Sequence, residues 1–252
     1  MAMVARWAMT TAPSKAMADP DHLRLIQWLS PAFPIGSFAY SQGLEAAIAS
    51  GDVRDADGLH DWIAAVLTHG SGRLDAGFIA LARAEAADLP ALADLCRAMA
   101  GSSERLTEMT EQGRAFGLTI GAVTGAIHEQ TLNALRQPVD FPHLKNVPAR
   151  DIPSLPYPLA VGQATRALKV ETSEVIMLSL QALAAQLTSV AVRFVPLGQT
   201  KGQIVLASLA PLIADLAVRY AKLTLDDLSS TTPGADMAAM RHETMDVRIY
   251  RT

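Results

Sequence analysis

Cysteine and aromatic residues are scarce in this chain of 252 residues: cysteine occurs once, and Phe, Trp and Tyr together make up 5%. A single cysteine excludes a disulfide framework and is typical of a protein of the reducing cytoplasm. Because Cys96 shares a helical face with Leu92 and Met99, we predict a buried structural thiol. Few aromatic residues beside abundant Ala and Leu favour helices packed through small side chains over a sheet.

Motifs that hold nucleotides or metal ions are also missing. The sequence contains no GxxxxGK[ST] phosphate loop, no HExxH, no CxxC and no GxSxG. The nearest glycine and lysine combination, residues 198–202, has the wrong spacing and no Ser or Thr after its lysine. The six histidines are far apart, and none lies four residues from another. We therefore assign no catalytic residue, no metal ligand and no cofactor.

Clusters of basic residues and uninterrupted apolar runs are absent as well. The formal net charge is −4, and the 21 Lys and Arg residues are scattered, so nucleic acid is not expected as a partner. The most apolar stretch, residues 175–192, contains five Ser, Thr and Gln residues, which would be costly in a bilayer. We predict a buried helix there rather than a membrane span.

What the sequence does have is helical periodicity along almost its whole length. Apolar residues recur on one face in residues 59–67, 74–82 and 161–168, and no stretch alternates with a period of two. Gly, Pro and Ser clusters separate these stretches at residues 51–52, 70–72, 90, 101–103 and 232–234. The pattern predicts an all-α protein, a single-domain helical bundle of about 7–11 helices.

Two regions stand out from this regular pattern. Residues 138–158 carry six of the 14 prolines and predict an extended connector, which we interpret as a surface loop within one domain rather than a linker between two. Small residues recur every four positions from Thr110 to Gly125, so another helix can approach closely there, from the same chain or from a second copy. We treat residues 1–20 as a flexible leader and residues 21–252 as the helical domain.

Three short segments carry more specific information. The first runs from Leu29 to Glu45 and includes PAFPIGSFAYSQGLE; the second is VPLGQT at residues 195–200; the third is MRHET at residues 240–244, followed by Arg248 and Arg251. In this order, the three segments resemble those of the urease accessory protein F family, and the resemblance covers the chain from about Leu25 to Arg251.

The resemblance implies an all-α homodimer that has no turnover of its own. Such a protein binds a second accessory protein, called D or H, and with it recruits the GTPase accessory protein G. The complex delivers nickel to apo-urease, so nickel is the cargo of the assembly. The residues expected to contact partners lie in the three segments or, for Arg193 and Lys201, directly beside the second one: Pro34, Gly36, Ser37, Tyr40, Ser41, Glu45, Arg193, Gln199, Lys201, Arg241, His242, Glu243, Arg248 and Arg251.

Several of these positions have more than one interpretation. Tyr40 is either an interface anchor or a core tyrosine with a bonded hydroxyl, and Ser37 or Ser41 can cap the helix that follows. Arg193 stands where many family members have lysine. It suggests an alternative function, in which the protein activates its partner GTPase by inserting an arginine into the GTPase site.

The tail, residues 240–252, is expected to be the surface that binds accessory protein D. It holds several charged groups in a segment too short to build a core, so we expect a partner surface to order it. Its removal is then expected to abolish partner binding and to leave the fold intact.

Overall fold

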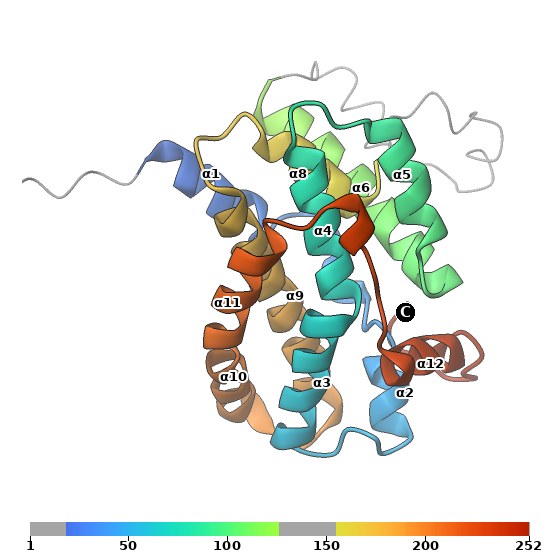
Figure 1. Cartoon of the computed structure of the whole chain (residues 1–252). Helices are drawn as coiled ribbons and strands as arrows, with labels where there is room; N and C mark the ends of the chain where they lie inside the picture. The colour runs from blue at the N-terminus through green and yellow to red at the C-terminus, as the bar shows by residue number, and fades with distance from the viewer. Residues whose placement is uncertain (1–18, 126–154, 252) are drawn as a thin grey trace, which may run out of the picture.

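The computed structural model describes residues 19–125 and 155–251, and the regular elements of this part of the chain are all helical (Figure 1). The prediction of an all-α fold is confirmed. The elements are α1 (Pro20–Trp28), η1 (Ser37–Ala39), α2 (Leu44–Ala49), α3 (Ala56–His69), α4 (Ser71–Arg83), α5 (Leu89–Ala98), α6 (Ser103–Val123), α8 (Tyr157–Thr165), α9 (Thr172–Phe194), α10 (Gly198–Ser208), α11 (Ala210–Tyr220), η4 (Leu225–Asp227) and α12 (Pro233–His242).

Short polar side chains fix where several helices begin. Asp55 accepts a hydrogen bond from the backbone N–H of Gly58 at the start of α3, and Ser102 accepts one from Arg105 at the start of α6. These contacts satisfy N–H groups that have no partner inside the helix. Pro90, which we predicted to mark a boundary between two helices, lies in the first turn of α5, where a missing N–H costs nothing.

Helix α9 is the central element of the core. It packs against α2, α3, α4, α10 and α11, and it buries Val175, Leu180 and Leu187. By length and hydropathy alone, α9 could cross a membrane, and so could the bent pair α10 and α11, a test that core helices also pass. The contacts of α9 agree with the predicted buried helix.

A second cluster of buried side chains lies under α5. Phe78 of α4, Cys96 of α5 and Met109 of α6 meet there, and the Cys96 sulfur lies 3.6 Å from the Met109 sulfur. Burial raises the pKa of the Cys96 thiol to about 12, which keeps it protonated and unreactive. The predicted structural thiol is confirmed.

The stripe of small residues on α6 faces α8. A Cβ atom added at Gly113 would lie 2.0 Å from the backbone oxygen of Leu155, so glycine is required for α8 to approach this closely. Gly117, one turn later, has nothing within 4 Å of its Cβ position and lines an open groove between α6 and α8. The stripe therefore serves an intramolecular contact at Gly113.

The described residues overlap only the ends of two predicted segments, the leader and the proline-rich loop. The leader falls outside the described residues up to position 18, while Pro20 already belongs to α1. The predicted proline-rich loop lies outside them from 138 to 154. Its last residues, Tyr157 and Pro158, are not extended but begin α8, because proline is tolerated in the first helical turn.

Candidate functional site

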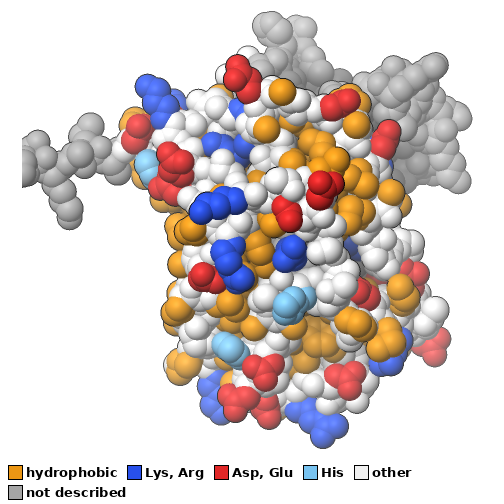
Figure 2. All heavy atoms as spheres, in the orientation of Figure 1, with side chains coloured by type: hydrophobic (Ala, Val, Ile, Leu, Met, Phe, Trp, Pro, Cys, Tyr) orange, Lys and Arg blue, Asp and Glu red, His pale blue; other side chains and the backbone are white. Residues whose placement is uncertain are grey.

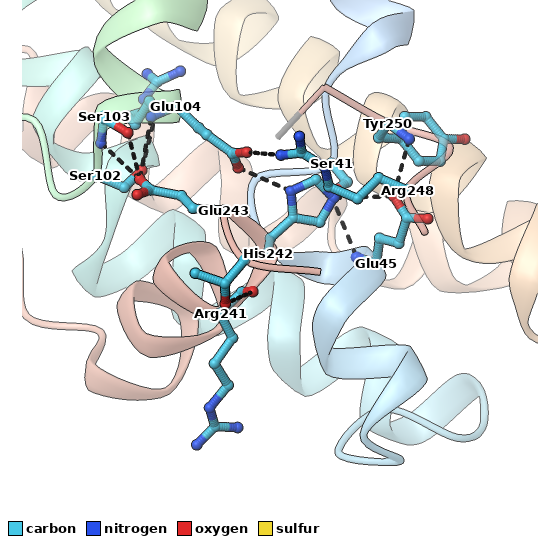
Figure 3. A network of polar contacts seen from close by, with 12 residues as sticks. Ser41, Glu45, Ser102, Ser103, Glu104, Arg241, His242, Glu243, Arg248 and Tyr250 are labelled. Atoms are coloured by element: carbon cyan, nitrogen blue, oxygen red, sulfur yellow. Dashed lines mark hydrogen bonds and ion pairs between the residues drawn. The ribbon is translucent and has the colours of Figure 1, made fainter. Parts of the chain in front are cut away.

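The first and third sequence segments meet at one place in the fold. Helix α2, the first turn of α6, the end of α12 and the residues after it converge there (Figure 3). We use the name tail for residues 240–251, the described part of the predicted segment. Figure 3 shows His242 between the side chains of Glu45 and Glu104, with Arg248 beside them.

Glu45 of α2 is the acceptor that holds the tail backbone. Its two carboxylate oxygens accept hydrogen bonds from the N–H groups of Ile249 and Tyr250, both at 2.9 Å. The residue is only 4% exposed. Burial raises the pKa of this carboxyl, but the two N–H groups and His242 outweigh burial, so the pKa lies below its ordinary value.

His242 is fully buried and bridges two carboxylates that come from different helices. Its Nε2 lies 3.0 Å from Oε2 of Glu45, and its Nδ1 lies 2.8 Å from Oε2 of Glu104. Glu104 also accepts a hydrogen bond from Arg248 at 2.6 Å. The site therefore joins two cationic positions of the tail to two acids of the helical body.

Glu243 points away from His242, as expected for neighbours on a helix. It caps the start of α6 and accepts hydrogen bonds from the hydroxyl of Ser103 at 2.8 Å and from its N–H at 2.9 Å. The Ser103 hydroxyl is the main cause that holds the pKa of Glu243 below its ordinary value. A carboxylate at this position also faces the positive end of the α6 dipole.

The last described residue, Arg251, is held by the first segment and by α6. Its guanidinium donates two hydrogen bonds to the Glu111 carboxylate, at 2.7 and 3.1 Å. The backbone N–H of Arg251 donates to the carbonyl of Ala39 at 2.7 Å. Tyr40 is 3% exposed and donates its hydroxyl proton to Glu111. Burial and the Glu111 carboxylate raise the pKa of Tyr40. Tyr40 is therefore the core tyrosine of our two interpretations.

The second sequence segment reaches the same site through Arg193. The guanidinium of this residue lies 5.9 Å from the ring centre of Tyr250 and donates to the Tyr250 hydroxyl at 3.2 Å. Gln199 and Lys201 are exposed on the first turns of α10, which Figure 1 places well apart from α12. Pro196 lies between α9 and α10, and Gly198, which has a φ of 70°, is the first residue of α10.

The remaining predicted residues occupy the loop before α2. Pro34 is exposed, while Gly36 and Ser37 are half-buried. Ser41 rather than Ser37 contacts α2, because its buried hydroxyl accepts a long hydrogen bond of 3.4 Å from the N–H of Glu45. Arg241 lies in α12 rather than in this loop. It is exposed, and its Nη1 lies 3.9 Å from Oδ2 of Asp52.

The expectation that a partner surface orders the tail requires correction. His242, Glu243, Arg248 and Arg251 all have partners within the same chain. Sequence reasoning missed those partners, above all Glu104 and Glu111. Ser102, Ser103 and Glu104 at the start of α6 have the pattern of a local helix cap. Nothing in the sequence connects them with tail residues about 140 positions later.

Sequence reasoning also missed an inner charged cluster between α4 and α6. Arg105 donates to Asp75 and, at 2.7 Å, to Glu108, whose side chain is 1% exposed. Gln42 and Gln112 each donate to Glu108 at 3.1 Å. Burial raises the pKa of Asp75 more than the Arg105 charge lowers it.

Two cavities of about 150 Å³ lie against the inner charged cluster, and Asp75, Arg105 and Glu108 line both. The first also contains polar side chains of α9, among them Ser179 and Gln186. Among the residues that the structure describes, no three His, Cys, Asp or Glu side chains are grouped so as to hold a metal ion.

The surface around the site is mixed in character. Figure 2 shows Lys and Arg interspersed with Asp, Glu and hydrophobic side chains on the face seen in Figure 1. Near the tail, some large apolar side chains point into solvent: Val247 is 80% exposed, Ile249 is 71% exposed and Phe38 is 74% exposed. The tail thus buries His242 and Tyr250 and presents Val247 and Ile249 to solvent.

Comparison with known proteins identifies the family. The UreF family model matches residues 53–210. The urease accessory protein UreF of Cereibacter sphaeroides (strain KD131 / KCTC 12085) is 50% identical over 230 residues, which cover 91% of this chain and 98% of the relative. The protein of the same name from Paracoccus denitrificans is 44% identical, over 93% of this chain and 97% of the relative. That from Roseobacter denitrificans is 40% identical, over 97% of this chain and 100% of the relative. The chain therefore belongs to the urease accessory protein UreF family.

Proposed function

We propose that this protein is a non-enzymatic adaptor in the cytoplasm, where it bridges accessory protein D (or H) and the GTPase accessory protein G. In that role, it helps to deliver nickel, the cargo of the complex, to apo-urease. The observation that carries the proposal is the docked tail, which presents Val247 and Ile249 to solvent although both are large and apolar. Exposed apolar side chains beside charged ones are common where proteins bind one another.

The tail suits partner binding because its geometry is set before a partner arrives. The Glu45 carboxylate fixes the backbone of Ile249 and Tyr250, and Glu111 fixes the side chain of Arg251. A segment that is already ordered loses less conformational entropy on binding than a free chain end. Accessory protein D then meets a rigid surface.

The alternative, activation of the GTPase by an inserted arginine, receives less support. Arg193 is exposed, but its guanidinium is engaged by the ring and hydroxyl of Tyr250. That contact gives Arg193 a role in holding the tail. Gln199 and Lys201 remain exposed on α10 and are our candidates for contact with accessory protein G.

The adaptor is proposed to act as a homodimer. The open groove at Gly117 between α6 and α8 and the exposed Ile204 and Val218 of α10 and α11 offer apolar surface to a second copy. A dimer of this kind would be symmetric, with the same patch on both copies. Light scattering at tens of micromolar distinguishes it from a monomer.

The test uses pull-down with purified accessory protein D. In the double variant Val247→Ser and Ile249→Ser, the outward side chains are truncated while the backbone contacts to Glu45 remain. We expect at least about tenfold weaker binding, because apolar anchors at an interface are commonly worth more than 1 kcal/mol each. The matched control, Leu23→Ser, removes an apolar side chain of α1 that is 62% exposed, and it should bind as the wild type does. Undiminished binding by the double variant at an unchanged melting temperature would refute the proposal.

A further inference from the structure

We infer that the tail docks on the helical bundle reversibly and that one proton controls the docking. The tail is docked while the His242 ring carries two protons, and it is released as the solution becomes alkaline. The inference concerns the chain alone and needs no partner. It rests on what the ring nitrogens of His242 face and on how deeply the ring is buried.

The ring is held by one carboxylate at each nitrogen. Glu45 lies 3.0 Å from Nε2 and Glu104 lies 2.8 Å from Nδ1, and His242 is 0% exposed. An ionised carboxylate only accepts hydrogen bonds, whereas a neutral imidazole has one donor and one acceptor nitrogen. Only the imidazolium form can donate to both carboxylates at once.

Loss of one proton therefore breaks one side of the bridge. The ring nitrogen that loses its proton turns a lone pair toward a carboxylate oxygen within hydrogen-bond distance, and water cannot replace the missing donor at a fully buried ring. Arg248 would then remain as the cation beside Glu104. The docked arrangement becomes unfavourable, and the tail, as a chain end, can leave.

The other charged groups around the ring do not supply this response. On α12, Arg241 is directed toward Asp52 and Glu243 toward Ser103. On α2, the pKa of Glu45 lies below its ordinary value despite burial, because of its N–H donors and His242, so Glu45 stays ionised across the neutral range.

At the far end of the tail, the pKa of Tyr40 is raised by burial and by Glu111, so Tyr40 keeps its proton in mildly alkaline solution. Arg248 and Arg251 keep their charge as arginines do. Histidine is the side chain whose charge ordinarily changes between about pH 5 and 8. We therefore assign the inferred response to His242, the ring held between two carboxylates.

Release has a defined readout in the full-length protein. The N–H groups of Ile249 and Tyr250 are hydrogen-bonded to Glu45 only while the tail is docked. We expect their protection from hydrogen exchange, corrected for the intrinsic pH dependence of exchange, to fall at least about tenfold between pH 6 and 9, the size expected for one lost charge-assisted hydrogen bond. The amide of Leu187 in the α9 core should keep its protection. Nitrogen-15 shifts of the His242 ring should show the second proton leaving over the same pH range.

Two variants sharpen the result. In Glu104→Gln, the side-chain amide can donate to Nδ1 of a neutral ring, so the fall in protection should shrink to less than about threefold whatever its starting level. In the control His60→Gln, a half-buried histidine beside Asp61 is lost, and the wild-type profile should persist. The inference is overturned by a flat wild-type profile, by a fall that does not follow the ring proton, or by an undiminished fall in Glu104→Gln.

Discussion

The tail site and the inner charged cluster both set two carboxylates against cations beside the first half of α6, yet they are built differently. At the tail, Glu45 and Glu104 face His242 and Arg248, and every cation comes from the chain end. In the inner cluster, Arg105 alone faces Asp75 and Glu108, and all three sit on helices of the core. The first arrangement can open without unfolding the bundle, and the second cannot.

The two sites also differ in how burial affects their acids. Backbone N–H donors lower the pKa of Glu45 in spite of burial, whereas burial raises the pKa of Asp75 in spite of Arg105. Donors that point at a carboxylate stabilise its charge more reliably than a single shared cation. Glu45, which accepts two backbone hydrogen bonds, is thus better suited than Asp75 to hold a segment that docks reversibly.

The largest effect is expected at the inner charged cluster, where nothing can move away. Arg105→Met leaves Asp75 and Glu108 without their cation, and it should lower the free energy of unfolding by about 3–5 kcal/mol. Urea unfolding followed by circular dichroism measures the loss. Arg97→Met, which removes an arginine paired with the exposed Asp94, should cost less than about 1 kcal/mol. Equal losses in the two variants would show that burial of the inner charged cluster is unimportant.

Removal of residues 240–252 should have the next largest effect. We expect the helical bundle to survive with about 2–3 kcal/mol less stability, because buried hydrogen bonds are lost but water can then reach Glu45 and Glu104. The midpoint of urea unfolding and the far-ultraviolet spectrum measure stability and fold separately. An unchanged midpoint would mean that the docked tail contributes nothing, and loss of the helical spectrum would mean that it belongs to the core.

The pH dependence of the two acids should have opposite signs. A lowered pKa stabilises the fold above the ordinary value of 4.5, and this effect is lost as acid protonates the group. The advantage of wild type over Glu45→Gln should therefore shrink as the pH falls below 4.5 and vanish once the folded Glu45 is itself protonated. A raised pKa does the reverse, so wild type should lose stability relative to Asp75→Asn as the pH rises from about 4 to 7. Melting temperatures at matched pH measure both differences. Parallel slopes would contradict the contrast.

The smallest effect is expected where the tail meets α9. Arg193→Lys replaces a planar group stacked on Tyr250 with a compact ammonium, and it should cost about 0.5–1 kcal/mol. Hydrogen exchange at the Tyr250 amide measures the loss locally. Arg219→Lys, in an exposed pair with Asp215 on α11, should leave that amide unchanged. A loss above about 2 kcal/mol would place Arg193 among the principal tail contacts.

Much of the fold could be predicted because helical faces are encoded locally. Leu59, Ile63 and Val66 lie three or four positions apart, and all three are buried in α3. The buried thiol at Cys96 followed from the same rule. Pro90 marked the boundary before α5 because proline is disfavoured in the interior of a helix but tolerated in its first turn.

The site was predictable only in part, since its contacts join positions far apart in the sequence. Glu45, His242 and Arg248 were recognised within their segments, but their meeting with Glu104 depends on how α2, α6 and α12 pack. Residues such as Asp75 and Arg105 show no unusual spacing, so nothing in the sequence marks them as buried. A charged side chain reveals its role through its surroundings, which periodicity does not describe.

The hydrogen bond from Tyr250 to Glu45 joins residues 205 positions apart, which has a consequence for the order of folding. Closing so long a loop is entropically costly, and the N–H donor is synthesised long after its acceptor. The bundle is thus expected to assemble before the tail docks, with the contact absent from the transition state. Changes at the tail should accelerate unfolding and leave the folding rate nearly constant. A chain whose synthesis stopped before the tail would fold its core but would unfold faster than the chain that carries the tail.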